Sequence, residues 1–256
     1  MRCAARLVGW TLAIFALGSL PGRAGAEAGP SPTISLFPGG TAAETITAPS
    51  AYAGSAGIYY VGAFAIRQII LGTRGRRAGV LDGAVTGGTA FGQPGHGLLV
   101  SATLADVDAL NNIYFSGRWQ LCPETVRSPA VAVGMEDILN NVEARQAVGS
   151  PYAVVSRTFW NPRLMLEGKS LLARTTLSLG YGGGRFRRQP FAALATSLSD
   201  CSQGIVEHDR YGFNVGLSAA PWRRQPGLVV GVYDMRIDNA SYHTVAGSLT
   251  YAWWRQ

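Results

Sequence analysis

Histidine is the side chain best suited to acid–base chemistry near neutral pH, and this chain has three histidines: His96, His208 and His243. Only His208 has carboxylates beside it, in the run Glu207-His208-Asp209. A general base must reach its partners on one side of the backbone, whereas neighbouring residues of a strand point to opposite faces. The sequence also contains no Gly-x-Ser-x-Gly nucleophile motif. These features predict a protein that is not an enzyme.

A second group of polar residues is spread over several strand-like runs and would face one interior if those runs closed into a barrel. Charges enclosed by a barrel need partners, so we expect Arg118 and Arg174 to pair with Glu136 and Glu207 across the lumen. Such a network either serves a function or only holds the shape of the barrel. The predicted lumen residues are Arg118, Gln120, Glu136, Arg157, Arg174, Glu207 and Asn214.

Two predicted connections between strands are rich in arginine. The first holds Arg74, Arg76 and Arg77, and the second holds Arg185, Arg187 and Arg188. The guanidinium group matches the geometry of phosphate oxygens, so these basic loops are candidate sites for lipopolysaccharide or an anionic polysaccharide. The alternative is that both clusters are solvated turns.

Cysteine usage bounds the redox and metal chemistry. Cys3 lies in the first 26 residues, which are expected to be removed on export. The exported chain then keeps Cys122 and Cys201, an even pair that is a candidate disulfide in an oxidising compartment. There is no Cys-x-x-Cys motif and no cluster of cysteine and histidine. The sequence therefore predicts neither a metal site nor a cofactor.

The elements that must position these residues are strands with alternating faces. In the run 113–121, apolar Ile113, Phe115 and Trp119 alternate with polar Arg118 and Gln120. The runs 98–105, 171–181 and 211–219 follow the same pattern. Runs of about nine to eleven residues are longer than most globular strands and suit a tilted crossing of a bilayer.

Weaker runs fill the gaps between these four and bring the expected number to about 12 strands, within a range of 10 to 14. Their polar faces carry mostly Gly, Ala, Ser and Thr, which suit a narrow lumen better than the water-facing side of a soluble sandwich. We predict an all-β fold, a transmembrane antiparallel up-and-down β-barrel over residues 56–256. The weaker runs are 57–67, 79–92, 130–136, 152–160, 191–199, 204–209, 228–236 and 241–254.

The first residues have the layout of a secretory signal peptide. Arginines precede an apolar run, residues 7–20, and the small-residue motif AGA follows at 24–26. A membrane-anchoring helix is the alternative, but the run is shorter than the roughly twenty residues that a spanning helix needs. We therefore predict a signal peptide over residues 1–26, and a linker or lumen-plugging segment, rich in Pro and Gly, over 27–55.

The charge balance argues against nucleic acid as a partner. The chain has 22 Lys and Arg against 15 Asp and Glu, and loss of Arg2, Arg6 and Arg23 with the signal lowers the basic count to 19. That excess is small for a protein that binds phosphodiester backbones, and an exported protein seldom meets them.

Aromatic residues gather near the ends of the runs, as in the two headgroup girdles of membrane barrels. A soluble sheet with an aromatic core is the alternative. The last run places Leu249, Tyr251 and Trp253 on one face. This ending is similar to barrel-assembly signals, so we expect outer-membrane lipid, lipopolysaccharide and the barrel-assembly machinery as partners.

Several stretches resemble a family of bacterial outer-membrane β-barrels of the cyanobacterial type and, more distantly, the YjbH-type barrels associated with exopolysaccharide. They are TAPSAYAGSAGIYYVGAFAIR, AVAVGMEDIL, SPYAVVSRTF, LSLGYGGGRF and IVEHDRYGFNVGLSAAPW. The resemblance implies the barrel fold more than any activity. In such barrels an acidic strand end precedes Asp-Gly and Asn-x-Gly; here Glu207, Asp209 and Asn214 match, while Arg210-Tyr211 replaces the glycine.

Together these features predict a porin-like or structural protein of the bacterial outer membrane, non-enzymatic and linked to surface polysaccharide. Two alternatives stay open from the sequence. One is a secreted or periplasmic β-sandwich that binds a ligand. The other is a barrel enzyme that modifies lipids through Glu207 or His208.

Overall fold

The computed structural model of this chain describes the strands and most of the turns between them. Residues before 45, which include the expected signal peptide, lie outside the described residues. The described ranges are 45–46, 48–54, 56–69, 81–93, 95–106, 111–139, 149–166, 169–199, 202–209, 212–219, 227–236 and 243–254.

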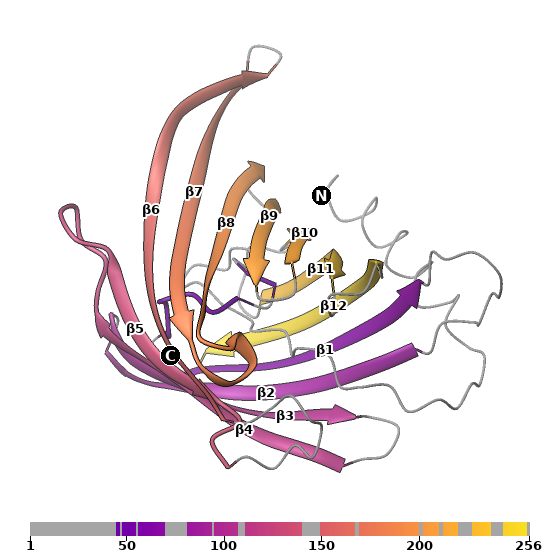
Figure 1. Ribbon diagram of the computed structural model, residues 1–256. Helices are drawn as coiled ribbons and strands as arrows, with labels where there is room; N and C mark the ends of the chain where they lie inside the picture. The colour runs from indigo at the N-terminus through magenta and orange to yellow at the C-terminus, as the bar shows by residue number, and fades with distance from the viewer. Residues whose placement is uncertain are drawn as a thin grey trace.

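Twelve antiparallel strands are described, and each overlaps one of the runs expected from the sequence (Figure 1). Each strand pairs with its neighbours in sequence, in an up-and-down order, and β1 also pairs with β12, so the sheet closes on itself. The strands are β1 (Ile58–Ile69), β2 (Leu81–Gln93), β3 (His96–Asp106), β4 (Asn111–Cys122), β5 (Ala130–Glu136), β6 (Ser150–Leu166), β7 (Lys169–Gly182), β8 (Gln189–Ser199), β9 (Ser202–Asp209), β10 (Gly212–Ala219), β11 (Gly227–Arg236) and β12 (His243–Trp254).

The barrel has two ends that differ in the length of their connections. At the proximal end β1 begins and β12 ends, because Ile58 pairs with Trp254. At the distal end Ile69 pairs with His243. The two longest connections, residues 70–80 and 137–149, join strands at the distal end. Of the four connections of only two residues, 94–95, 167–168 and 200–201 join strands at the proximal end, and 210–211 joins strands at the distal end.

Alternation along the strands separates an apolar outer face from a polar inner face. On β4, Ile113 and Trp119 are 49% and 54% exposed, whereas Arg118 and Gln120 between and beside them are buried. On β10, Phe213 is 66% exposed while its neighbour Asn214 is completely buried. This polarity is the reverse of a soluble sheet, whose apolar side is covered.

A short 3-10 helix, η1 (Gly184–Phe186), follows β7 at the distal end and folds inward, so that Phe186 is buried. The longest strands, β6 and β7, project beyond their neighbours as a two-stranded ribbon at the proximal end (Figure 1). Among the described residues, no helix has the length and apolar character needed to cross a membrane.

Candidate functional site

A segment before β1, residues 45–46 and 48–54, lies inside the ring of strands and bends at Ile46, Ala48 and Ala51; we call it the lumen strap (Figure 1). Ala48, Ser50 and Ala51 have no exposed surface. Side chains of β4, β6 and β9, which occupy different parts of the ring, all contact it. The strap is the described part of the linker or plug expected over 27–55, and it occupies the lumen.

The proximal part of the strap is held at the end of β4. The backbone N–H of Ala53 donates to Oε1 of Gln120 at 3.2 Å. The Tyr52 hydroxyl donates to Oε2 of Glu124 at 2.5 Å and also lies 3.0 Å from Oγ1 of Thr158. Because Gln120 and Glu124 lie close to the proximal end of the barrel, the strap enters the lumen there.

The middle of the strap is held from two sides. The backbone N–H of Ala51 donates to Oγ of Ser156 at 2.8 Å, and that hydroxyl is 2.7 Å from Oγ of Ser178. From β4, Nη1 of Arg118 donates to the carbonyl oxygen of Ser50 at 3.0 Å. A buried backbone group that has no strand beside it needs such side-chain partners.

The distal part of the strap is held by one carboxylate. Oε2 of Glu207 accepts the backbone N–H groups of Ile46 and Ala48, at 2.9 and 3.2 Å. Its other oxygen accepts Nδ2 of Asn214 at 3.0 Å, and the same amide is 3.3 Å from Asp209 Oδ2. All of these side chains are buried. Hydrogen bonds of this kind compensate the cost of burying the Glu207 carboxylate.

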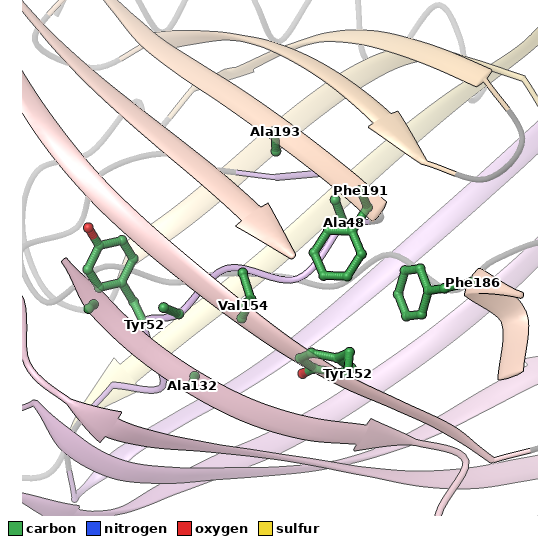
Figure 2. Close-up of a cluster of buried hydrophobic side chains, with 10 residues drawn as sticks. Ala48, Tyr52, Ala132, Tyr152, Val154, Phe186, Phe191 and Ala193 are labelled. Atoms are coloured by element: carbon green, nitrogen blue, oxygen red, sulfur yellow. The ribbon is translucent and has the colours of Figure 1, made fainter. Parts of the chain in front are cut away.

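Apolar side chains cover another side of the strap and form an apolar wall: Tyr152, Val154, Phe186, Phe191 and Ala193. Figure 2 shows Ala48 of the strap beside Phe191. The rings of Phe186 and Phe191 lie 4.7 Å apart, and both meet the ring of Tyr152 edge to face, at 6.1 and 6.3 Å. The lumen is therefore filled by packing on this side.

Glu136 forms an ion pair with Arg185, a partner that the sequence analysis did not assign to it. Nη2 of Arg185 donates to Oε1 of Glu136 at 2.8 Å, and the guanidinium lies 4.1 Å from the centre of the Phe186 ring. Burial would lower the pKa of Arg185, but the Glu136 charge and its hydrogen bond raise it above the usual value. Arg185 is buried and thus does not belong to an exposed basic loop, because η1 folds it into the barrel mouth.

The other predicted basic residues divide into two groups. Arg187 and Arg188 are exposed and have positive φ angles of 51° and 59°, as expected in a tight turn. The cluster of Arg74, Arg76 and Arg77 lies outside the described residues.

The predicted lumen residues mostly face inward. Arg118, Gln120, Glu207 and Asn214 are buried there, and Arg174 alternates in phase with the buried Thr176 and Ser178. The structure joins Glu207 to Asn214 and brings Arg118 and Gln120 to the strap.

Arg157 does not belong to this set, and its prediction is corrected. It alternates in phase with the exposed Val155 and Phe159, so it lies on the outer face. There its Nη2 donates to the carbonyl oxygen of Val126 at 3.1 Å, and the guanidinium lies 5.8 Å from the centre of the Phe159 ring. The sequence of the strand alone does not reveal this, because a shift of one residue in phase moves a side chain to the other face of the sheet.

The acid and imidazole of the Glu207-His208 pair are separated by the sheet. Glu207 is buried in the lumen, whereas His208 is exposed and its ring meets Phe213 at 4.9 Å. The described residues contain no group of three or more His, Cys, Asp or Glu placed to hold a metal ion. Cys122 is a free, exposed thiol, against the expected bridge to Cys201, which lies outside the described residues.

Sequence reasoning missed Tyr52 of the strap, its partner Glu124, and Ser156, which holds the middle of the strap. Glu124 also accepts the backbone N–H of Thr158 at 2.6 Å, which ties the connection after β4 to β6. None of the three stands out by type or spacing. Their role depends on a segment that is distant in sequence.

No protein-family model and no curated protein sequence matches this chain. A solved structure, "Crystal structure of Neisserial surface protein A (NspA)", aligns with 78% of this chain and 98% of that chain. The sequence identity is 8% and the TM-score is 0.22. A likeness this weak carries no argument, so the resemblance to the cyanobacterial-type family stays a prediction.

Proposed function

We propose that this protein spans the bacterial outer membrane as a β-barrel whose lumen is closed by its own N-terminal strap. The observation that carries the proposal is the apolar outer face. Large apolar side chains are exposed on strand after strand, among them Trp119, Tyr181, Phe213 and Leu217. In water such a surface favours aggregation, whereas in a bilayer it is the surface that lipid chains require.

The length of the strands also supports a location in a lipid bilayer. β1, β4 and β12 have 12 residues each. At a rise of ~3.3 Å per residue and a tilt of ~40°, such a strand covers about 30 Å along the barrel axis, which matches the hydrocarbon core of a bilayer.

The lengths of the connections support one orientation. Outer-membrane barrels have short periplasmic turns and longer extracellular loops. The two-residue connections 94–95, 167–168 and 200–201 therefore favour a periplasmic proximal end, and the long connections 70–80 and 137–149 favour an extracellular distal end.

The filled lumen favours a structural role over an open pore. The strap lies along the interior, and the apolar wall and the Arg185–Glu136 pair fill it near the distal end. We propose that the barrel has no catalytic activity. The exposed Arg187 and Arg188 beside the distal opening are the described groups that could meet an anionic polysaccharide or lipopolysaccharide.

Both alternatives fit the geometry less well. A ligand-binding sandwich needs two sheets packed face to face, whereas these strands form one continuous ring. A lipid-modifying enzyme based on Glu207 and His208 needs both groups at one site, and they lie on opposite faces.

The proposal is tested by fractionation and by electrophysiology. We expect the protein in the outer-membrane fraction, with heat-modifiable migration in detergent, and no steady conductance in a planar bilayer. Release of the protein by osmotic shock would reject the membrane barrel. A large steady conductance would reject the closed lumen and leave the barrel standing.

A further inference from the structure

The lumen strap lies in the barrel without being part of its sheet. Residues 45–46 and 48–54 belong to no strand, and the ring closes around them through the pairing of β1 with β12. The strap therefore adds nothing to the strand ladders that keep the ring closed. Its departure would leave each described strand pair in place.

The inner face keeps hydrogen bonds of its own where it meets the distal half and the middle of the strap. Oε2 of Glu207 accepts N–H groups of the strap, while its Oε1 accepts Nδ2 of Asn214 at 3.0 Å. Oγ of Ser156 accepts the N–H of Ala51 and also lies 2.7 Å from Oγ of Ser178. Water in place of the strap would donate to the same oxygen atoms, so these side chains do not need the strap to stay paired.

The same division holds at the proximal end of the strap. Oε2 of Glu124 accepts the Tyr52 hydroxyl, while its Oε1 accepts the backbone N–H of Thr158 at 2.6 Å. Gln120 accepts the strap through Oε1 and donates from Nε2 to the carbonyl oxygen of Cys122 at 3.4 Å. The wall therefore has one set of bonds to itself and a second set that strap and water can exchange.

The strap is slender over most of its length. Its residues 48–54 read APSAYAG, in which Tyr52 is the single large side chain. A single backbone needs a width of roughly 5 Å, the spacing of neighbouring strands, whereas a water molecule has a radius of about 1.4 Å. A cavity lined by Tyr52, Gly54, Tyr60 and Arg118 already lies beside the strap. The course of the strap, once empty, would admit water and small solutes.

Packing keeps the strap in place at rest. Ala48, Ala51 and Tyr52 belong to one buried cluster with the apolar wall. Departure of the strap would expose this apolar surface to water, and the cost rises with the exposed area. The closed state therefore predominates, as a lumen closed by the strap requires.

We propose that the lumen strap is an exchangeable plug, and that the barrel holds a passage for water and small hydrophilic solutes when the strap leaves. This inference rests on the proposed function, in which the strap closes a membrane barrel. It adds a second, open state to that barrel. The observation that carries it is the wall's own set of hydrogen bonds, which does not depend on the strap.

Single-channel recording in planar bilayers tests the plug with variants that disfavour the bound strap and leave the wall unchanged. Ala48→Asp places a second carboxylate close to that of Glu207, which accepts the Ala48 N–H. Ala51→Pro removes the N–H that Ser156 accepts. The control, Val126→Asp, adds the same carboxylate at a side chain that is 94% exposed. Heat-modifiable migration verifies that each variant has folded.

We expect each strap variant to raise the time-averaged conductance by at least about tenfold over the native protein and the control, because the bound strap then carries an unfavourable charge or loses a bond. Folded strap variants that conduct no more than the control overturn the proposal. Failure of both to fold also overturns it, since the barrel would then require its strap. Native protein outside the membrane would instead reject the proposed function.

A disulfide identifies the strap as the moving part. Ala51→Cys and Ser156→Cys are combined with Ala48→Asp in a chain that carries Cys122→Ser and Cys201→Ser, and mass spectrometry verifies the bridge. We expect the oxidised protein to stay closed and dithiothreitol to restore the conductance of Ala48→Asp. Equal conductance in the two redox states would show that current does not follow the course of the strap, and would overturn the proposal.

Discussion

The two sides of the lumen hold the same strap by different means. The apolar wall of Tyr152, Val154, Phe186, Phe191 and Ala193 contributes packing, which is non-directional and sets no register along the strap. The opposite side presents single acceptors and donors, such as Glu207, Gln120 and Arg118, and each one meets a particular backbone group. We infer that packing supplies most of the stability of the strap in the lumen, and that hydrogen bonds decide its register.

Loss of a ring from the apolar wall should have the largest effect. Phe191→Ala removes a fully buried ring that contacts Phe186 and Tyr152. We expect the free energy of unfolding to fall by about 3–5 kcal/mol, because a large buried side chain leaves a cavity. Urea unfolding in lipid vesicles, followed by tryptophan fluorescence, measures it.

The control for this change is the same substitution on the outer face. Phe213 is 66% exposed and most of its ring contacts no protein atoms, so Phe213→Ala should cost much less. Equal losses for the two variants would show that the apolar wall is not a packed core.

Removal of the distal acceptor should have the next largest effect. Glu207→Leu leaves the N–H groups of Ile46 and Ala48 without their acceptor and takes one partner from Asn214. We expect a loss of about 2–3 kcal/mol, because each buried donor without a partner costs about 1–3 kcal/mol and release of the strap relieves part of it. Protease cleavage within residues 45–54, measured on the folded barrel, should increase.

Glu207→Gln separates the hydrogen bonds from the charge, since the amide keeps one acceptor oxygen for the strap. The strap in the Glu207→Gln variant should resist protease nearly as well as the native strap, and better than the strap in the Glu207→Leu variant. If both variants leave the strap fully protected, the register does not depend on this carboxylate.

Added volume behind the apolar wall should have the smallest effect of the three. A methyl group at Gly180 would overlap the ring of Phe191 and come within 2.8 Å of the carbonyl oxygen of Ala153. Gly180→Ala should therefore cost about 1–3 kcal/mol through displacement of Phe191. Gly204→Ala is the matched control, since its nearest neighbours there are carbons of Leu198 at 3.5 Å or more. A barrel with Gly180→Ala that is as stable as the control would contradict the tight packing of this wall.

The outer face could be predicted residue by residue because it has a single requirement. In the proposed membrane, lipid would accept any large apolar side chain, so a strict period of two from Ile113 through Trp119 marks that face whatever its neighbours are. All twelve strand-like runs followed from this alternation and from the turn residues between them. The phase of a less regular run is harder to assign, and Arg157 was placed on the wrong face for that reason.

The sequence by itself determined the strand order, the alternation and the absence of a recognisable catalytic motif, because these depend on local chemistry and spacing. Only the tertiary structure decided what fills the lumen. Glu207 and Ile46 are 161 positions apart, and no local pattern connects them. Arg185 likewise meets Glu136 because η1 turns into the barrel mouth. Contacts across a closed interior depend on barrel curvature and on strand tilt, and neither is encoded in a stretch of neighbouring residues.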